Sequence, residues 1–328
     1  MEATDALLSN LTSPAVLAFF LGVMACLAKS DLRVPQQVYD VISQYLLFAI
    51  GLKGGFAIAE AEISVLVAPI TATLVLGVVT PIIGYVLALK IGRLSKIDAA
   101  AIAAHYGSVS AVTFMAAISF VQITYGANSY DHFMVALLAV LEIPAILLAL
   151  ILAAYVKDKG SVPITEVVGE VFTGKTMVLL IGGMAIGMIS GMPGKELVET
   201  VFIIPFQGVL VFFMLEMGIV AAERLRDIQK RDCVLVVTYG ITVPLLYSFI
   251  GIVIGHMAGL SDANLVIFAT MAASASYIAA PAAIRMSLPE ANPAIYLTAS
   301  LGVTLPFNLL VGIPLYREAV MVLAPMLG

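Results

Sequence analysis

Two apolar segments of the sequence carry a pair of serines where a lipid-facing helix would carry leucine or valine. Ser108 and Ser110 lie in the run Ala-His-Tyr-Gly-Ser-Val-Ser-Ala-Val-Thr. Ser274 and Ser276 lie in the run Ala-Ala-Ser-Ala-Ser-Tyr-Ile-Ala-Ala-Pro. Hydroxyl groups are neutral hydrogen-bond donors that can hold an anion. Serine among small residues also permits close helix packing in lipid, but the matched pairs favour a binding site.

A glycine and a proline predict that both serine segments are interrupted helices. Pro281 removes a backbone N–H and clashes with the preceding turn, so we expect a break there or just before. Gly107 can provide the corresponding hinge beside the first pair. Backbone groups freed by such a break are tolerated inside a membrane only where they line a cavity or are buried in protein. Two half-helix N-termini that meet at one point would attract a small anion without a fixed cation.

Glu142 is a carboxylate inside the apolar run Ala-Val-Leu-Glu-Ile-Pro-Ala-Ile. An acid near the middle of a membrane costs roughly 2.5 kcal/mol or more to insert and is therefore a functional candidate. It can bind Na⁺ through oxygen or carry a proton. Oxygen atoms of Ser110 and Ser276 would complete a Na⁺ shell, and Thr304 and Asn308 are further candidates for ion coupling.

Two other polar residues in apolar runs are weaker candidates. Glu216 is a second acid in an apolar segment, close to a group of charged residues, so a solvated position near the helix end is equally open. His105 lies three residues before Ser108, where it can pack as a core residue or take part in gating or protonation.

The composition shows what kind of protein must position these residues. Of the 328 residues, 62% are apolar and 11% are charged, with a net charge of −5. Soluble domains contain about 25% charged residues, so a soluble enzyme or a disordered chain is excluded. The acidic balance offers no basic surface for nucleic acid. The sequence predicts an all-α polytopic membrane protein.

Charged residues, glycines and prolines divide the chain into ten predicted spans. Each span must supply enough apolar length to cross a hydrocarbon core about 30 Å thick. The predicted spans are Pro14–Ala28, Pro35–Ala59, Ile63–Leu89, Ile97–Ile123, His132–Val156, Lys175–Ser190, Leu197–Ala222, Cys233–Ala258, Asp262–Met286 and Pro293–Leu315.

The spans form two sets of five. Residues 1–157 and 175–328 hold one set each, and residues 158–174 form a predicted cytoplasmic linker. Because five is odd, the second set enters the membrane in the opposite orientation, which predicts an inverted repeat. The first serine pair recurs about 166 residues later, and Glu142-Ile-Pro has a counterpart in Thr304-Leu-Pro. We expect the broken fourth and ninth helices to cross near the membrane midplane.

Basic residues set the predicted orientation. Loops that carry many lysines and arginines face the cytoplasm. In a ten-span arrangement, twelve of the sixteen basic residues fall on one side: Lys29, Arg33, Lys90, Arg93, Lys96, Lys157, Lys159, Arg224, Arg226, Lys230, Arg231 and Arg285. We therefore expect a multi-pass protein of the plasma (inner) membrane, with both termini on the non-cytoplasmic side.

This pattern resembles the SbtA-type sodium-dependent bicarbonate transporters. The likeness rests on ten spans in two inverted halves, Gly-Ser-x-Ser in span four and Ala-Ser-x-Ser followed by proline in span nine. It also rests on Ile-Pro-Ala in span five and on Ala-Asn-Pro-Ala-x-Tyr at 291–296, through to Thr304-Leu-Pro. The resemblance covers essentially the whole chain.

The resemblance implies Na⁺/HCO₃⁻ symport by a core of spans three to five and eight to ten, against a gate formed by the other four spans. It also implies a homotrimer and a cytoplasmic PII-like regulator. The residues that it would place around the anion are Gly107, Ser108, Ser110, Ser274 and Ser276, with Na⁺ close by.

Two positions depart from the family's pattern. Tyr277 stands where the pattern has an aspartate, and Ala280-Pro281-Ala282 replaces Gly-Pro-Pro. A tyrosine can donate a phenolic hydrogen bond to an anion, so Tyr277 joins the predicted substrate site.

Other functions remain open at this stage. A Na⁺- or H⁺-coupled transporter of a small organic carboxylate fits the same residues. A passive anion channel would need a continuous polar stripe, whereas the polar residues gather at one depth. An enzyme is not expected, because no His-Glu-x-x-His, Gly-x-Ser-x-Gly or paired membrane aspartate occurs. The predicted partners are the anion, Na⁺ as coupling ion and membrane lipid, with no nucleic acid and no other cofactor.

Overall fold

The computed structural model describes most of the chain as helices joined by short connections. The described residues are 11–60, 62–138, 140–142, 173–227, 230–277 and 288–328, with Leu8, Pro144, Leu148, Ile151, Ala280 and Ile284 as single residues. No strand occurs among them. Only residues 173 and 174 of the predicted linker belong to this part of the chain, so the linker lies largely outside the described residues, and Pro281 also lies outside them.

The helices follow one another in two series. The first comprises α2 (Pro14–Leu27), α3 (Gln36–Glu60), α4 (Ile63–Lys90), α5 (Lys96–Gly107) and α6 (Ala111–Tyr125). The second comprises α9 (Lys175–Val198), the π-helical turn η1 (Glu199–Ile203), α10 (Phe206–Asp227), α11 (Lys230–Met257) and α12 (Asp262–Ala272). The C-terminal part comprises α14 (Pro293–Leu297), η2 (Thr298–Thr304), α15 (Leu305–Phe307), η3 (Asn308–Gly312) and α16 (Ile313–Leu327).

Six helical segments are long and apolar enough to cross a membrane. They are Gln36–Glu60, Ser64–Lys90, Lys96–Tyr125, Met177–Arg226, Cys233–Met257 and Pro293–Leu327. Two shorter apolar helices, α2 and α12, accompany them. The all-helical membrane-protein class is therefore confirmed, whereas the count of ten spans and the inverted repeat stay predictions.

Capping residues fix where several helices begin. Ser13 precedes Pro14 and accepts a hydrogen bond from Val16 N at 3.4 Å. Ser95 accepts one from Asp98 N at 3.0 Å. Asn292 precedes the proline that opens α14 and accepts from Ala294 N at 3.0 Å. Such side chains satisfy backbone donors that have no partner inside the helix.

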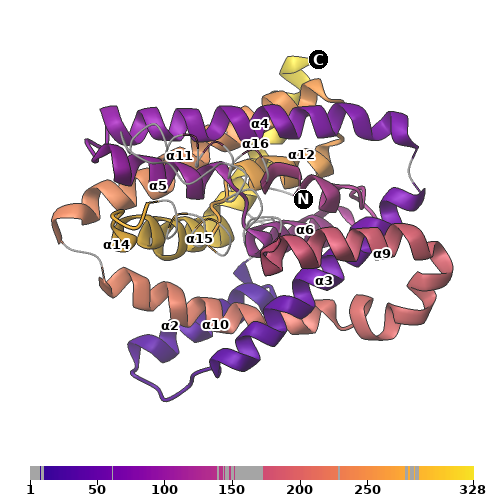
Figure 1. Cartoon of the computed structure of the whole chain (residues 1–328), viewed down its shortest axis with the longest axis horizontal. Coiled ribbons are helices and arrows are strands. Elements are labelled where there is room, and N and C mark those ends of the chain that lie inside the picture. The colour runs from indigo at the N-terminus through magenta and orange to yellow at the C-terminus, as the bar shows by residue number, and fades with distance from the viewer. Residues whose placement is uncertain are drawn as a thin grey trace.

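Helices α2, α3, α9 and α10 form one group, seen in the lower half of Figure 1. Within it, α2 packs on α10 and α3 packs on α9. The α3–α9 contact runs along glycines: a Cβ on Gly51 would lie 2.6 Å from Leu180 O, and one on Gly187 would lie 2.5 Å from Leu52 O. Small residues allow this close backbone approach.

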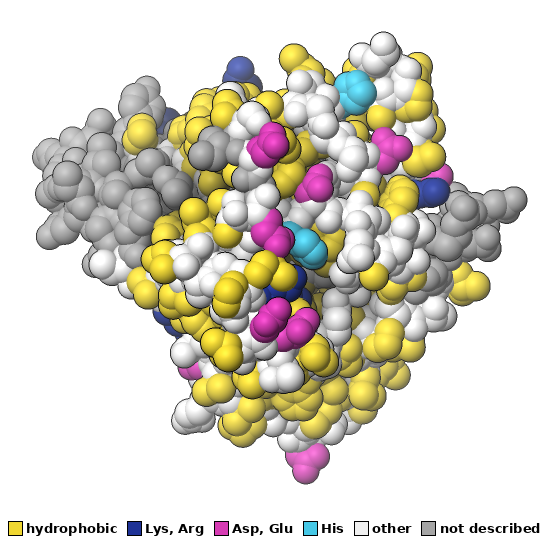
Figure 2. All heavy atoms as spheres, turned by 90° about the vertical axis from the view of Figure 1, so that its right-hand side faces the viewer, with side chains coloured by type: hydrophobic (Ala, Val, Ile, Leu, Met, Phe, Trp, Pro, Cys, Tyr) yellow, Lys and Arg dark blue, Asp and Glu magenta, His cyan; other side chains and the backbone are white. Residues whose placement is uncertain are grey.

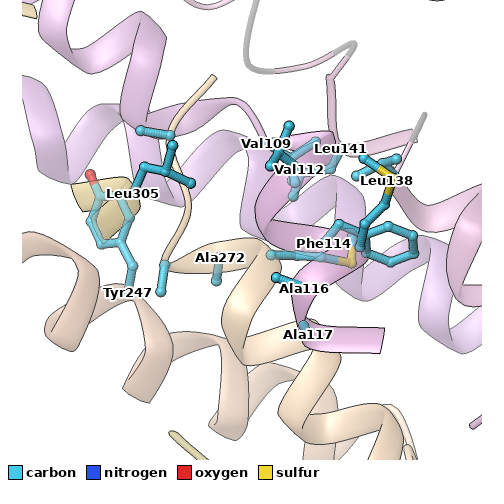
Figure 3. Close-up of a cluster of buried hydrophobic side chains, with 14 of the residues drawn as sticks. Val109, Val112, Phe114, Ala116, Ala117, Leu138, Leu141, Tyr247, Ala272 and Leu305 are labelled. Carbon is cyan, nitrogen blue, oxygen red and sulfur yellow. The ribbon is translucent and has the colours of Figure 1, made fainter. Parts of the chain in front are cut away.

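Helices α4, α5, α11, α12 and α16 form a second group, in the upper half of Figure 1. Here α5 packs on α4, while α12 packs on α11 and α16. Figure 3 shows a cluster of buried apolar side chains that includes Val109, Leu141 and Ala272, the last residue of α12. All three residues are at most 4% exposed.

Some predicted span boundaries are wrong. A span was expected to begin at Leu197, but α9 continues to Val198 through a bend at Gly191 with φ 54°, and α10 begins at Phe206. The last helical segment was expected to stop at Leu315 but runs to Leu327. Arg317 and Glu318, whose charges marked that limit, pair with each other and stay within the helix.

Candidate functional site

The first serine pair lies at a helix break. Helix α5 ends at Gly107, Ser108 has extended backbone angles (φ −95°, ψ 172°) and α6 begins after Ser110. Ser110 is the N-cap of α6: its Oγ accepts hydrogen bonds from Thr113 N at 3.1 Å and from Thr113 Oγ1 at 3.0 Å. The hydroxyl hydrogen of Ser110 therefore remains able to donate.

The second pair also lies at a break. Helix α12 ends at Ala272, and residues 273–277 are not helical. The helix is thus already interrupted several residues before Pro281, which is outside the described residues. Ser276 Oγ accepts a hydrogen bond from Ala280 N, four residues further on, at 3.3 Å.

The two breaks touch. Ser110 N donates to Ser274 Oγ at 2.9 Å, and Ser276 N donates to His105 O at 2.8 Å. The Ser274 hydroxyl itself donates a hydrogen bond to Met271 O at 2.8 Å. Backbone groups released by each break are thereby satisfied by the other segment, which is what a dry environment requires.

A small pocket opens beside this contact, with about 250 Å³ of empty space including the part open to the outside. The described residues that line it are Leu47, Val109, Ser110, Ala111, Glu142, Ser276 and Tyr277. The pocket brings together all three residues predicted to hold Na⁺: Glu142, Ser110 and Ser276. Glu142 is only 4% exposed.

Two hydroxyl groups at this site are buried without a hydrogen-bond partner among the described residues. They belong to Ser108 and Tyr277. The Ser108 side chain lies next to the carboxylate of Glu142 without forming a hydrogen bond of normal geometry. Because an unsatisfied buried hydroxyl costs about 1–3 kcal/mol, both groups are suited to bind something that the protein itself does not supply.

Gly107 lies beside the pocket in a packing role. A Cβ added there would come 2.5 Å from Pro81 Cβ. The absence of a side chain lets the end of α5 lie directly against α4. Gly107 thus positions the first break without lining the pocket.

Thr304 and Asn308 do not line the pocket with Glu142. Thr304 Oγ1 donates to Gly240 O at 2.7 Å and lies 2.6 Å from the Tyr106 hydroxyl. Asn308 Nδ2 donates to Ala273 O at 2.9 Å, and its Oδ1 accepts from Tyr316 at 2.6 Å. Their polar atoms are already used, and Asn308 holds the second break in place.

His105 packs as a core residue. Its Nδ1 lies 2.7 Å from Ala101 O, which indicates that this nitrogen carries the proton. The ring stacks on Tyr296 with the centroids 4.4 Å apart. Its backbone oxygen, rather than its imidazole, contacts the second break.

Sequence reasoning missed the apolar part of the pocket wall. Leu47 comes from α3, in the other helix group, and nothing in its sequence context marks it. Val109 lies between Ser108 and Ser110, and Ala111 follows Ser110. The sequence therefore identified this segment, but it did not identify these two residues as part of the pocket wall. A second pocket next to Tyr277, which also contains Glu216, was not predicted.

The electrostatics of the pocket follow from its lining. Among the described lining residues, Glu142 is the one acid, and neither lysine nor arginine is present. An anion beside an ionised carboxylate is strongly repelled in a medium of low dielectric constant. The pocket can therefore hold an anion stably only together with a cation or with a proton on Glu142.

The chain was compared with known protein families. A family model described as the Na⁺-dependent bicarbonate transporter superfamily matches residues 14–321, nearly the whole chain. No curated protein matches the chain. The matched region includes both helix breaks, Glu142 and all the residues that line the pocket. The chain therefore belongs to the Na⁺-dependent bicarbonate transporter superfamily.

Proposed function

We propose that this protein carries bicarbonate or a similar small anion across the plasma membrane together with Na⁺, and that both bind where the two helix breaks meet. One observation carries the proposal: a buried acid and neutral hydroxyls share a pocket whose described lining has no basic side chain. Such a pocket attracts an anion only when a cation accompanies it. This requirement is the physical basis of coupling.

Each residue has a proposed role. Glu142 with the hydroxyl oxygens of Ser110 and Ser276 binds Na⁺, since hard cations prefer oxygen ligands. The hydroxyls of Ser108 and Tyr277, which have no partner among the described residues, donate to the anion. Ser274 holds Ser110 N and so positions the first break beside it. Gly107 positions the first break. Thr304 and Asn308 support ion coupling indirectly by holding the second break.

Helix packing supports a ten-span inverted repeat. In that arrangement the α2–α10 and α3–α9 contacts would be equivalent, as would α4–α5 and α11–α12. Side-chain contacts repeat in the same way. Asp98 Oδ1 accepts from Asn292 N at 2.8 Å, and Asn264 Oδ1 accepts from Asp131 N at 2.9 Å. Movement of one helix group against the other would then expose the site alternately to the two sides of the membrane.

Assembly and sidedness complete the proposal. The termini lie on the non-cytoplasmic side, the protein forms a homotrimer, and a PII-like protein regulates it from the cytoplasm. These features rest on the distribution of basic residues and on the family resemblance.

Transport in liposomes tests the function. We expect an inward Na⁺ gradient to drive uptake of labelled bicarbonate at alkaline pH, where little is present as permeant CO₂, and uptake to saturate. Uptake of short organic carboxylates in preference to bicarbonate, with or without a proton gradient in place of Na⁺, would support the alternative substrate class. Flux that ignores the ion gradient and does not saturate would indicate a passive channel.

A further inference from the structure

Tyr277 lies between two pockets. It lines the pocket at the helix breaks and also a larger one, with about 670 Å³ of empty space including its open part. The other described residues of the larger pocket are Gln36, Tyr39, Glu216, Val220, Arg224, Leu297 and Leu301. The two spaces therefore meet at the tyrosine ring.

Helix α3 shows where the larger pocket leads. Leu47 of α3 lines the smaller pocket, whereas Tyr39 and Gln36 line the larger one. At 1.5 Å per residue, Tyr39 is about 12 Å from Leu47 along the helix. Gln36 is the first residue of α3, so the larger pocket reaches the end of this helix. Arg224 lies there too, on the side that the basic residues assign to the cytoplasm.

The opposite direction along α3 is closed by close packing of Gly54 against side chains. Gly54, seven residues after Leu47, faces Val135: a Cβ added to Gly54 would lie 2.8 Å from Val135 Cγ1. Helix α3 is thus in close contact with the segment of Val135 about 10 Å from Leu47 toward the non-cytoplasmic side. Opening this side requires α3 to move away from the segment of Val135.

The cytoplasmic side is closed differently. Tyr277 belongs to the non-helical segment 273–277, and its hydroxyl has no hydrogen-bond partner among the described residues. The hydroxyl lies next to the Ser110 side chain, but no hydrogen bond of normal geometry joins the two. A side chain of this kind can change rotamer without movement of a helix.

We propose that Tyr277 is the inner gate of the transporter: its ring separates the site at the helix breaks from the cytoplasmic pocket and swings aside to release the anion. This inference deepens the proposed function and rests on it. The structure then corresponds to an inward-facing state with the gate closed. An anion that passes Tyr277 enters a pocket whose lining includes both Glu216 and Arg224.

Sided cysteine labelling tests the gate without requiring transport. In a background with Cys26→Ala and Cys233→Ala, the reporter is Leu47→Cys, whose thiol would face the smaller pocket. A small membrane-impermeant thiol reagent is applied to inside-out or right-side-out vesicles. We expect Tyr277→Ala to raise the labelling rate from the cytoplasmic side on the order of tenfold, equivalent to a barrier lower by ~1.4 kcal/mol, with no increase from the other side.

Matched variants separate the ring from other effects. Tyr277→Phe keeps the ring and should label at the original rate. Leu301→Ala widens the larger pocket alone and should also leave the rate unchanged. If Tyr277→Ala does not fold, Tyr277→Val serves instead, and Ala111→Cys provides a second reporter.

The gate is refuted if removing the ring leaves cytoplasmic labelling unchanged, or if Leu301→Ala raises it equally. Because labelling needs neither Na⁺ nor bicarbonate, this result is independent of the uptake assay. If the uptake assay shows no bicarbonate transport but the labelling result supports the gate, the conclusion would be a gated site for another solute.

Discussion

Glu142 decides what can bind beside it. The carboxylate is buried in a pocket whose described lining contains hydroxyl and apolar groups. While ionised, it repels any anion held by the serines, and Na⁺ bound to the same oxygens removes that repulsion. The anion and the cation then stabilise one another, which makes their binding reciprocal.

Removing this charge should therefore change the response to Na⁺. We expect Glu142→Gln to raise the Na⁺ concentration needed for half-maximal uptake about tenfold or more, equivalent to about 1.4 kcal/mol of lost cation binding. The change in substrate selectivity should be smaller. The control variant is Glu216→Gln. Glu216 accepts a hydrogen bond from Val34 N at 3.3 Å, and replacing this acid should leave the dependence on Na⁺ in place. An unaltered Na⁺ response in Glu142→Gln would remove this residue from coupling.

The two central serines should differ in a second experiment. Leucine at Ser108 or Ser274 should fill the site and abolish uptake while the protein still inserts into the membrane. Alanine separates their roles. Ser274→Ala loses the acceptor for Ser110 N and should lower stability by about 1 kcal/mol. Ser108→Ala loses no hydrogen bond within the described residues and should keep the melting temperature. Normal uptake by both leucine variants would exclude the serines from the site.

The sequence predicted the polar residues of the site better than their neighbourhood. Serine pairs in apolar segments are conspicuous, so Ser110 and Ser276 could be identified. Asn308 was a candidate for ion coupling, and its amide forms hydrogen bonds with Ala273 and Tyr316. Which buried partner satisfies an amide depends on the packing of several helices, and residue spacing does not contain that information. Leu47 carries no chemical signal at all.

At the scale of helices, glycine seams hold the α3–α9 pair together. We expect Gly187→Ala to destabilise the protein by about 1–3 kcal/mol, because its Cβ would meet backbone atoms that cannot move aside. Gly182 is the control, since a Cβ there meets nothing within 4 Å. Gly182→Ala should raise stability by about 0.5–1 kcal/mol through helix propensity. Thermal unfolding in detergent measures both, and equal melting temperatures would contradict the seam.

Helix interruptions were predictable, but their limits were not. Glycine and proline signalled the breaks near Ser108 and Ser274, yet the second begins at Ala273, well before the proline. The contacts of Ser274 and Ser276 with α5 and α6 replace the missing helical hydrogen bonds there. The bend at Gly191 was hidden within an apolar segment, because apolarity alone does not reveal a residue with positive φ.

At the scale of the molecule, the two helix groups form the moving parts of the proposed cycle. Figure 2 shows the end of the molecule at the right of Figure 1, with acidic and histidine side chains near its middle. Apolar side chains lie along other parts of this surface. This distribution agrees with a polar face that meets water and sides that meet lipid.

The ten-span arrangement makes a definite prediction about sidedness. Epitope tags fused to either terminus should both be reached by protease added outside intact cells. A tag inserted between residues 158 and 172 should be protected until the membrane is opened. Termini on opposite sides would rule out an even number of spans and, with it, the inverted repeat of five and five.

The central claim is that anion and Na⁺ bind together where the interrupted helices meet. A cryo-electron microscopy structure in saturating sodium bicarbonate, compared with one in which choline chloride replaces it, tests this most directly. We predict density for an anion within hydrogen-bond distance of Ser108 or Tyr277, and for a cation at Glu142, in the first structure alone. A pocket that stays empty in both, with bicarbonate bound elsewhere, would contradict the claim.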